Sequence, residues 1–256
     1  MPRRQDAPVG APCWIDVFTS DPDGAQAFYS ELFGWEAASS GPEYRGYFNF
    51  TKDGLKVAGG MRNDGGARTP DSWSVYLATT DAGATAAAVT GHGGQMIVPP
   101  MGVMALGTMA VATDPGQAAI GIWQPAEHRG FELLAEPDAP AWFELHTRDY
   151  LASVDFYRSV FDWDTHVAAD TPEFRSTTLG EGEGQLAGIM DASAILAEDQ
   201  PAQWSVYFNV RDTDATLERI VELGGSVLEP AEDTPSGRLA TAADTTGARF
   251  KLQSGG

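Results

Sequence analysis

The chain has 256 residues, enough for one large domain or for two domains of about 125 residues each. Hydrophobic residues make up 43% of the sequence and aromatic residues 10%, which suffices for packed cores and argues against a disordered chain. The formal net charge of −20 repels nucleic-acid phosphates and anionic lipid, and no apolar stretch approaches the roughly 18 residues of a membrane span. We therefore expect neither a nucleic acid nor a membrane as a partner.

The expected cellular location rests on the N-terminus and on the cysteine content. The arginines near the N-terminus are not followed by the apolar region of a secretory signal. The single cysteine, Cys13, cannot form an internal disulfide, and it is best interpreted as a small packing residue beside a strand. These features predict a cytoplasmic protein.

The first predicted elements are a strand and a helix, and both recur in the second half of the chain. Residues 14–35 read WIDVFTSDPDGAQAFYSELFGW, and residues 142–163 read WFELHTRDYLASVDFYRSVFDW. In each copy an alternating stretch predicts a strand, and an aspartate, Asp21 or Asp149, is expected to cap the helix that follows. Pro22 suits the first helical position. The two halves therefore arose by duplication.

A second strand and helix follow in each half, since WSVYLATTDAGATAAAVTGHGG (73–94) corresponds to WSVYFNVRDTDATLERIVELGG (204–225). Short β-like runs come after every predicted helix, at residues 47–50, 55–61, 107–113, 119–123, 176–180, 185–190, 238–243 and 249–253. This order predicts an α+β fold made of four βαβββ units, two in each half.

A glycine- and acid-rich segment separates the halves and places the predicted domain boundaries. We expect an N-terminal extension (1–11), a first domain (12–125), a linker (126–139) and a second domain (140–256).

The repeated motif resembles the vicinal oxygen chelate superfamily of glyoxalases, bleomycin-resistance proteins and extradiol dioxygenases. It consists of an aspartate, then Phe-Tyr seven residues later, then Phe-x-Trp, found here at Asp21, Phe28, Tyr29, Phe33 and Trp35 and again at Asp149, Phe156, Tyr157, Phe161 and Trp163. The segments 114–125 and 244–253 are similar to the final hairpin of that superfamily. The resemblance covers nearly the whole chain, in the fused double-domain form of actinobacterial glyoxalase-like proteins, and implies that each half folds into a cup.

In the metal-using members of the family, three strands of each cup carry His, Gln or Glu ligands. The resemblance assigns those positions here to Trp14, Val75 and Gly121 in the first cup and to Trp142, Val206 and Lys251 in the second. None of these side chains ligates a divalent cation as His or Glu does. We therefore expect no metal and no other cofactor. One alternative is a displaced metal site at Glu144 and His146, which share a strand face.

Strand alternation predicts what each cup offers instead of a metal. In the first cup, Trp14, Trp73 and Trp123 are expected to form stacking walls with Val75, and Asp16 to orient a ligand. The alternative for Trp73, and for Trp204 in the second half, is a place in the core, because strand alternation puts them beside the valines only if the strand is regular. In the second cup the predicted ligand-binding residues are Trp142, Glu144, Val206, Arg249 and Lys251. Glu144 and His146 together form a candidate catalytic pair. The competing interpretation is structural, with aromatic core in the first cup and a plug of paired charges in the second.

The favoured functional hypothesis is a metal-free protein that binds an aromatic or apolar small molecule, such as a secondary metabolite, as the drug-sequestering members of the superfamily do. The alternatives are a metal-independent lyase, isomerase or cyclase, a glyoxalase or dioxygenase with a displaced metal site, and a partner-binding role. Because a fused pair already supplies two domains, we expect a monomer or a homodimer.

Overall fold

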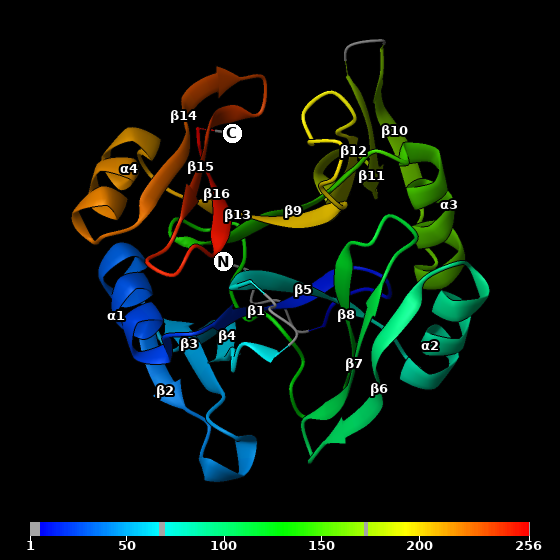
Figure 1. The fold of residues 1–256 in the computed structure, drawn as a ribbon, viewed down its shortest axis with the longest axis horizontal. Helices are drawn as coiled ribbons and strands as arrows, with labels where there is room; N and C mark the ends of the chain where they lie inside the picture. Colours follow the sequence, from blue (N-terminus) through cyan, green and yellow to red (C-terminus); the bar gives the residue numbers. More distant parts are fainter. Residues whose placement is uncertain (1–5, 67–69, 172–173, 256) are drawn as a thin grey trace.

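The computed structural model describes residues 6–66, 70–171 and 174–255 and contains two eight-stranded sheets, one from each half of the chain (Figure 1). The elements of the first half are β1 (Pro12–Thr19), α1 (Pro22–Phe33), β2 (Glu36–Ser39), η1 (Pro42–Tyr44), β3 (Phe48–Lys52), β4 (Leu55–Arg62), β5 (Ser72–Ala78), α2 (Ala82–Gly91), β6 (Gln95–Val103), β7 (Gly107–Thr113) and β8 (Ala119–Pro125). Those of the second half are β9 (Ala139–Thr147), α3 (Tyr150–Phe161), β10 (Thr165–Asp170), β11 (Arg175–Leu179), η3 (Gly182–Gly184), β12 (Ala187–Asp191), β13 (Gln203–Asn209), α4 (Thr213–Glu222), β14 (Ser226–Thr234), β15 (Gly237–Ala243) and β16 (Arg249–Ser254).

Each sheet joins two βαβββ units through their first strands. In the first half the strand order is β2-β3-β4-β1-β5-β8-β7-β6, with β1 parallel to β4 and antiparallel to β5. The second half repeats this order as β10-β11-β12-β9-β13-β16-β15-β14. The predicted α+β fold of four βαβββ units is confirmed.

The β-like runs predicted from the sequence do not include four strands of the structure, namely β2, β6, β10 and β14. They form the outer edges of the two sheets, and most of their residues are exposed or half-buried. An edge strand exposed on both faces needs no alternation of apolar and polar residues, so its sequence carries little signal.

The two matching helices begin differently, although an aspartate precedes each. The Asp21 side chain accepts a hydrogen bond of 3.1 Å from the backbone N–H of Gly24, as expected of an N-cap. Asp149 occupies the N-cap position of α3 but makes no side-chain capping bond. The predicted capping bond is therefore confirmed for Asp21 and wrong for Asp149.

This difference makes the duplicated helices a matched pair for a stability test. We expect Asp21→Ala to lower the free energy of unfolding by about 1 kcal/mol, because an amide of the first turn loses its acceptor. Asp149→Ala should cost less than half as much. Urea denaturation of both variants measures the two values, and equal losses would contradict the assignment of the cap to Asp21 alone.

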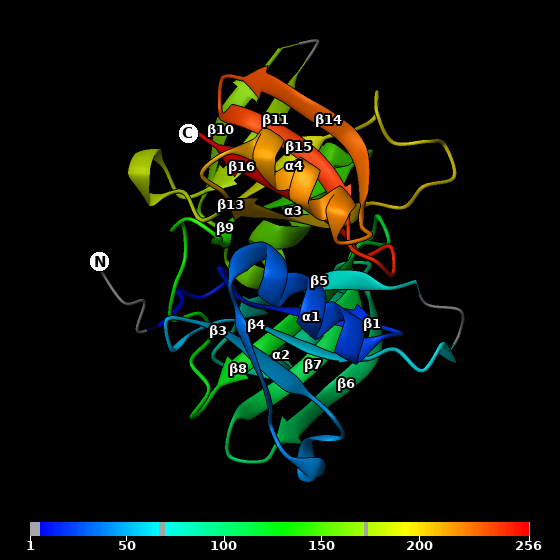
Figure 2. The same ribbon diagram turned by 90° about the vertical axis from the view of Figure 1, so that its left-hand side faces the viewer.

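The two halves pack through the helix-bearing faces of their sheets, with α1 beside α4 and α2 beside α3 (Figures 1 and 2). Tyr29 of α1 lies at the centre of one contact. Its hydroxyl accepts a bond of 2.9 Å from the Trp73 indole and donates one of 3.0 Å to Asp244 of the other half. On the opposite side, Tyr157 receives a bond from Trp204 and donates to Asp114, at 3.0 and 3.2 Å.

These two hydrogen-bonded triads use residues of the repeated motifs. Each triad takes its tyrosine and tryptophan from one half and its aspartate from the final hairpin of the other. The motifs therefore hold the two halves together, as well as building each half.

The segments outside the sheets are also anchored. The carbonyl of Gly10 accepts a bond of 2.9 Å from the Trp163 indole, and the amide of Phe131 bonds to the carbonyl of Cys13 at 2.9 Å. Residues 1–5 of the predicted N-terminal extension lie outside the described residues. The boundaries of the extension, linker and domains stay predictions. Among the described residues, every helix is too short or too polar to span a lipid bilayer.

Candidate functional site

The register of the central strands decides which residues share the open face of each sheet. In the first half Trp14 lies opposite Tyr76, which lies opposite Gly121. In the second half the corresponding row is Trp142, Tyr207 and Lys251. Residues paired across neighbouring strands project from the same face, so each row crosses the floor of one cup.

This register corrects three sequence-based assignments. Val75 pairs with Ile15 and Val206 with Phe143, on the face of the sheet that packs against the helices. Trp73 lies on that face too, because its indole donates to Tyr29 of α1. Val75, Val206 and Trp73 are therefore core residues, and Tyr76 and Tyr207 take the predicted places of the valines.

A buried carboxylate, Asp16, lies at the centre of the first cup. Its Oδ1 accepts bonds of 2.9 Å from the Trp14 indole and 2.5 Å from the Tyr47 hydroxyl, and Tyr76 also hydrogen-bonds to it. Gly59 lies directly beside this group, where a Cβ would come within 2.4 Å of Asp16 Oδ1. Desolvation by burial raises the pKa of Asp16 from 3.8 to about 6, although the three hydrogen bonds lower it.

Side chains of the chain itself cover the first cup. The His128 ring packs edge-on against the Trp14 ring, with centroids 4.5 Å apart. The backbone carbonyl of His128 accepts a hydrogen bond of 2.9 Å from the Trp123 indole. The ring of Phe131 also contacts Trp14, with centroids 5.5 Å apart. Only 3% of Trp14 and 7% of Trp123 is exposed. The predicted stacking walls are therefore already in contact with other side chains, which favours the structural interpretation of this cup.

The second cup holds Glu144 at the position that corresponds to Asp16. Its Oε2 accepts bonds of 2.8 Å from His146 Nε2 and 2.8 Å from the Tyr207 hydroxyl, and its Oε1 accepts a longer bond of 3.5 Å from the Trp142 indole. Burial acts to raise the pKa of Glu144, but the bonds from His146, Tyr207 and Trp142 and the charge of His146 hold it below its ordinary value. Glu144 is therefore ionised at neutral pH.

A lysine closes the other side of the second cup. Lys251 Nζ donates to Thr241 at 3.0 Å and to Glu229 at 3.3 Å, and it lies 5.7 Å from the centre of the Tyr207 ring. Arg249, on the same strand face, is exposed. Lys251 thus pairs with Glu229, and Tyr207 lies between Lys251 and Glu144.

Two substitutions between the repeats distinguish the cups. Strand pairing places Ser176 where the first cup has Tyr47, so no phenol hydroxyl covers Glu144 from that side. It also places Lys251 where the first cup has Gly121, over which the ring of Tyr76 lies. The Glu144 side chain is 15% exposed, and Trp142 is half-buried. The second cup is therefore the more accessible and the more polar of the two.

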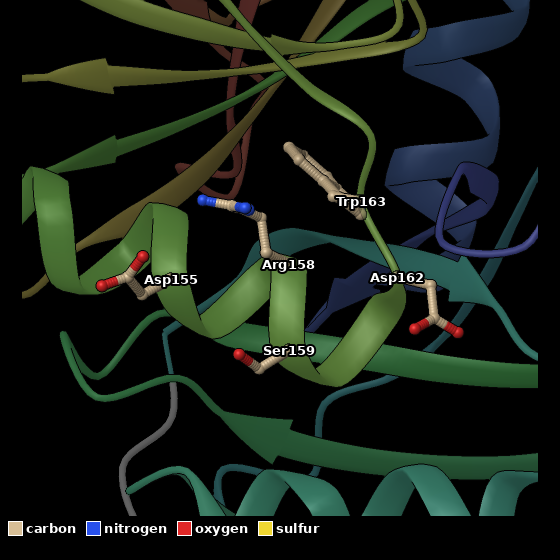
Figure 3. A pocket seen from close by; sticks show the side chains of 5 residues that line it. All are labelled: Asp155, Arg158, Ser159, Asp162 and Trp163. Atoms are coloured by element: carbon tan, nitrogen blue, oxygen red, sulfur yellow. The ribbon is translucent and has the colours of Figure 1, made fainter.

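The structure also has hollows away from the cups. A shallow depression of about 530 Å³ lies along α3 and is lined by Asp155, Arg158, Ser159, Asp162 and Trp163 (Figure 3). A smaller one of about 210 Å³ lies between the start of α2 and the end of α3. The first has a mostly polar and open lining, which suits a solvated surface better than a ligand site. We place the candidate site in the second cup.

Sequence reasoning missed the tyrosines of this site, although a signal for them was present. In the repeated strand, Trp73, Val75 and Leu77 are the apolar set, which alternation assigns to the core, and Tyr76 then falls on the open face. The roles of Tyr47, Glu229 and Thr241 carried no such signal, because sequence-distant strands bring them to the cups.

The donor sets of the cups do not fit a divalent cation. The row Trp14–Tyr76–Gly121 offers an indole and a phenol. The row Trp142–Tyr207–Lys251 offers an indole, a phenol and a lysine amine. Within the described ranges, no group of three or more His, Cys, Asp and Glu side chains could hold a metal ion. Glu144 and His146 form a pair without a third ligand of that kind. The absence of a bound metal stays a prediction, which elemental analysis of the purified protein tests.

Comparison with known proteins agrees with the topology. The family model described as the Glyoxalase/Bleomycin resistance protein/Dioxygenase superfamily matches residues 13–122 and 139–252. The chain belongs to this superfamily. It is 36% identical over 260 residues to the anthracycline biosynthesis protein DnrV of Streptomyces peucetius, covering 95% of this chain and 92% of that protein. It is 33% identical to the protein CFP32 of Mycobacterium bovis, covering 98% and 97% of the two chains.

Solved structures of the superfamily share the fold at low sequence identity. The Mn(II)-bound glyoxalase of Novosphingobium aromaticivorans has a TM-score of 0.66 and 16% identity, covering 96% of this chain and 82% of that one. The 2,3-dioxygenase LapB of Pseudomonas sp. KL28 has a TM-score of 0.64 and 12% identity, covering 97% and 93%. At these identities the likeness establishes the fold alone.

Proposed function

We propose that this member of the superfamily binds an aromatic small molecule in its second cup. The observation that carries the proposal is the half-buried indole of Trp142 beside the ionised carboxylate of Glu144. An indole face stacks on planar ligands, and a carboxylate fixed by three donors orients a ligand through one further hydrogen bond. The tyrosine and the imidazole hold Glu144 in place, so little ordering is needed on binding.

The relatives support the class of ligand. DnrV and DauV, which are 36% and 37% identical to this chain over 95% of its length, are named for anthracycline biosynthesis. Anthracyclines contain fused aromatic rings, which match a cup with the rings of Trp142 and Tyr207 better than a small aldehyde does. We therefore propose a fused-ring secondary metabolite as the natural ligand, either held without turnover or presented to another enzyme.

A direct binding experiment tests this proposal. An anthracycline aglycone is titrated into the protein, and we expect saturable quenching of tryptophan emission. Glu144→Gln should raise the dissociation constant about tenfold, since one charge-assisted hydrogen bond is weakened. Asp16→Asn, the matched change in the covered first cup, should leave it within a factor of two. Equal losses in both variants, or quenching that never saturates, would contradict binding in the second cup.

A second candidate function is metal-free acid–base catalysis, and one observation favours it. His146 and Glu144 are 2.8 Å apart, and His146 is only 3% exposed, so the pair is oriented and largely desolvated. Chromatography of the incubated aglycone separates the candidates. A product that wild type forms and Glu144→Gln does not would establish turnover, and unchanged ligand with saturable binding would establish sequestration.

A further inference from the structure

Two polar groups of the second cup retain hydrogen-bonding capacity on opposite sides of the Tyr207 ring. On one side, Glu144 Oε2 accepts from both His146 and Tyr207 at 2.8 Å. Among the residues that the structure describes, only the Trp142 indole donates to its Oε1, at 3.5 Å. A carboxylate oxygen has two acceptor positions, so Oε1 is available to a stronger donor.

On the other side, Lys251 retains a donor. Its ammonium group has three N–H bonds, and within the described chain two of them go to Thr241 and Glu229. Nζ lies 5.7 Å from the centre of the Tyr207 ring, and the Lys251 side chain is 20% exposed. The third N–H is therefore available to an acceptor that enters the cup.

The charges around Lys251 decide which kind of acceptor fits. Glu229 already neutralises the lysine, and Glu144 adds a second carboxylate on the far side of Tyr207. An anionic ligand group would be repelled by both carboxylates, whereas the cations Lys251 and His146 are already paired with Glu229 and Glu144. A neutral carbonyl oxygen accepts the same N–H without that repulsion.

The strands set the distance between the two groups. Glu144 is on β9 and Lys251 on β16, with β13 between them and an offset of two residues along the strands, so their backbones are about 12 Å apart. Glu144 Oε2 bonds to the Tyr207 hydroxyl, and Lys251 Nζ lies over the Tyr207 ring. We therefore choose a two-ring aromatic core with one polar group at each end as the size of ligand to test.

We infer that the second cup recognises a neutral hydroxylated aromatic ketone or quinone, whose hydroxyl donates to Glu144 Oε1 and whose carbonyl accepts from Lys251 Nζ. This inference rests on the proposed function and specifies its ligand class. It assigns Lys251 as a specificity-determining residue, whereas Trp142 and Tyr207 supply contacts that any flat aromatic molecule shares.

A series of four matched naphthalenes tests the inference by isothermal titration calorimetry. The probe with both groups is 6-acetyl-2-naphthol. Its methyl ether lacks the donor, 6-ethyl-2-naphthol lacks the acceptor, and 6-hydroxy-2-naphthoate replaces the ketone by an anion. We expect 6-acetyl-2-naphthol to bind about tenfold more tightly than each of the other three, which corresponds to about 1.4 kcal/mol.

Variants assign each preference to its residue. Glu144→Gln should abolish the preference for the hydroxyl over the methyl ether and keep the preference for the ketone. Lys251→Met should abolish the preference for the ketone over the ethyl group and keep that for the hydroxyl. Arg62→Met, which removes an exposed cation of the first half, controls for the change in net charge and should alter neither.

The outcomes separate the two proposals. If all four naphthalenes bind with similar affinity, the proposal that the second cup binds aromatic molecules is kept and the inferred ligand class is overturned. Tightest binding of the naphthoate would overturn the charge argument, and selectivity that survives Lys251→Met would overturn the assignment of Lys251. Failure of all four compounds to bind at millimolar concentration would overturn the proposed function itself.

Discussion

Replacing Phe208 by alanine is expected to lower the free energy of unfolding by about 4 kcal/mol. Phe208 belongs to β13 of the second half and has no exposed surface. Its ring lies 5.0 Å from Phe33, 5.6 Å from Trp35 and 5.4 Å from Trp73, all in the first half, and 5.6 Å from Phe250 in its own. Truncation leaves a cavity among large rings that cannot collapse around it.

Because these contacts cross between the halves, the variant also tests whether the halves unfold together. Equilibrium urea denaturation should show one transition that moves to lower urea concentration with an unchanged slope. Leu151→Ala, which truncates a side chain that is 65% exposed, is the control and should stay within about 0.5 kcal/mol of wild type. A biphasic curve in which only one phase moves would show that the halves are independently stable.

The fold could be predicted from the sequence because its signals are local and occur twice. Alternation marks the central strands, and Asp21 with Pro22 marks the start of α1. Because each pattern recurs at the corresponding position of the second half, two weak signals support each predicted element. The contacts between the halves could not be predicted, since Tyr29 and Asp244 are 215 residues apart and local patterns say nothing about such pairs.

The candidate site was only partly predictable, for a reason of strand geometry. Glu144, Trp142 and Lys251 were assigned to the open face of the second cup, and the structure places them there. The assignment of Val75 and Val206 to the cups was wrong because a shift of one residue along a strand moves every side chain to the other face. The cover over the first cup was missed because His128 and Phe131 come from a connecting segment without periodicity.

The carboxylates at the centres of the two cups should respond to pH in opposite directions. Burial raises the pKa of Asp16 from 3.8 to about 6, so the folded protein keeps this proton at pH values where the unfolded chain has lost it. Stability linked to Asp16 is therefore present at low pH and is lost as pH rises to about 6. For Glu144, whose pKa is lowered, the linked stability is present at neutral pH and is lost as pH falls.

Amide variants isolate the two contributions from those of the other acidic residues. Wild type loses the stability linked to Asp16 between pH 4 and pH 7, whereas Asp16→Asn has no proton to lose at this position. The free energy of unfolding of Asp16→Asn relative to wild type should therefore rise by up to about 3 kcal/mol over this interval, the equivalent of a shift of about two pKa units. The stability of Glu144→Gln relative to wild type should fall over the same interval, because the variant lacks the charge that His146 and Tyr207 stabilise. Urea denaturation at both pH values measures each difference.

The direction of the two changes bears on which cup is functional. A carboxylate that is destabilised when ionised, bonded to a Trp14 ring that His128 and Phe131 contact, belongs to a packed interior, whereas one held ionised by an imidazole and a phenol is ready to accept a hydrogen bond from a ligand. If both variants instead gained stability with pH, Glu144 would be as poorly solvated as Asp16. The second cup would then lose its advantage as the binding site.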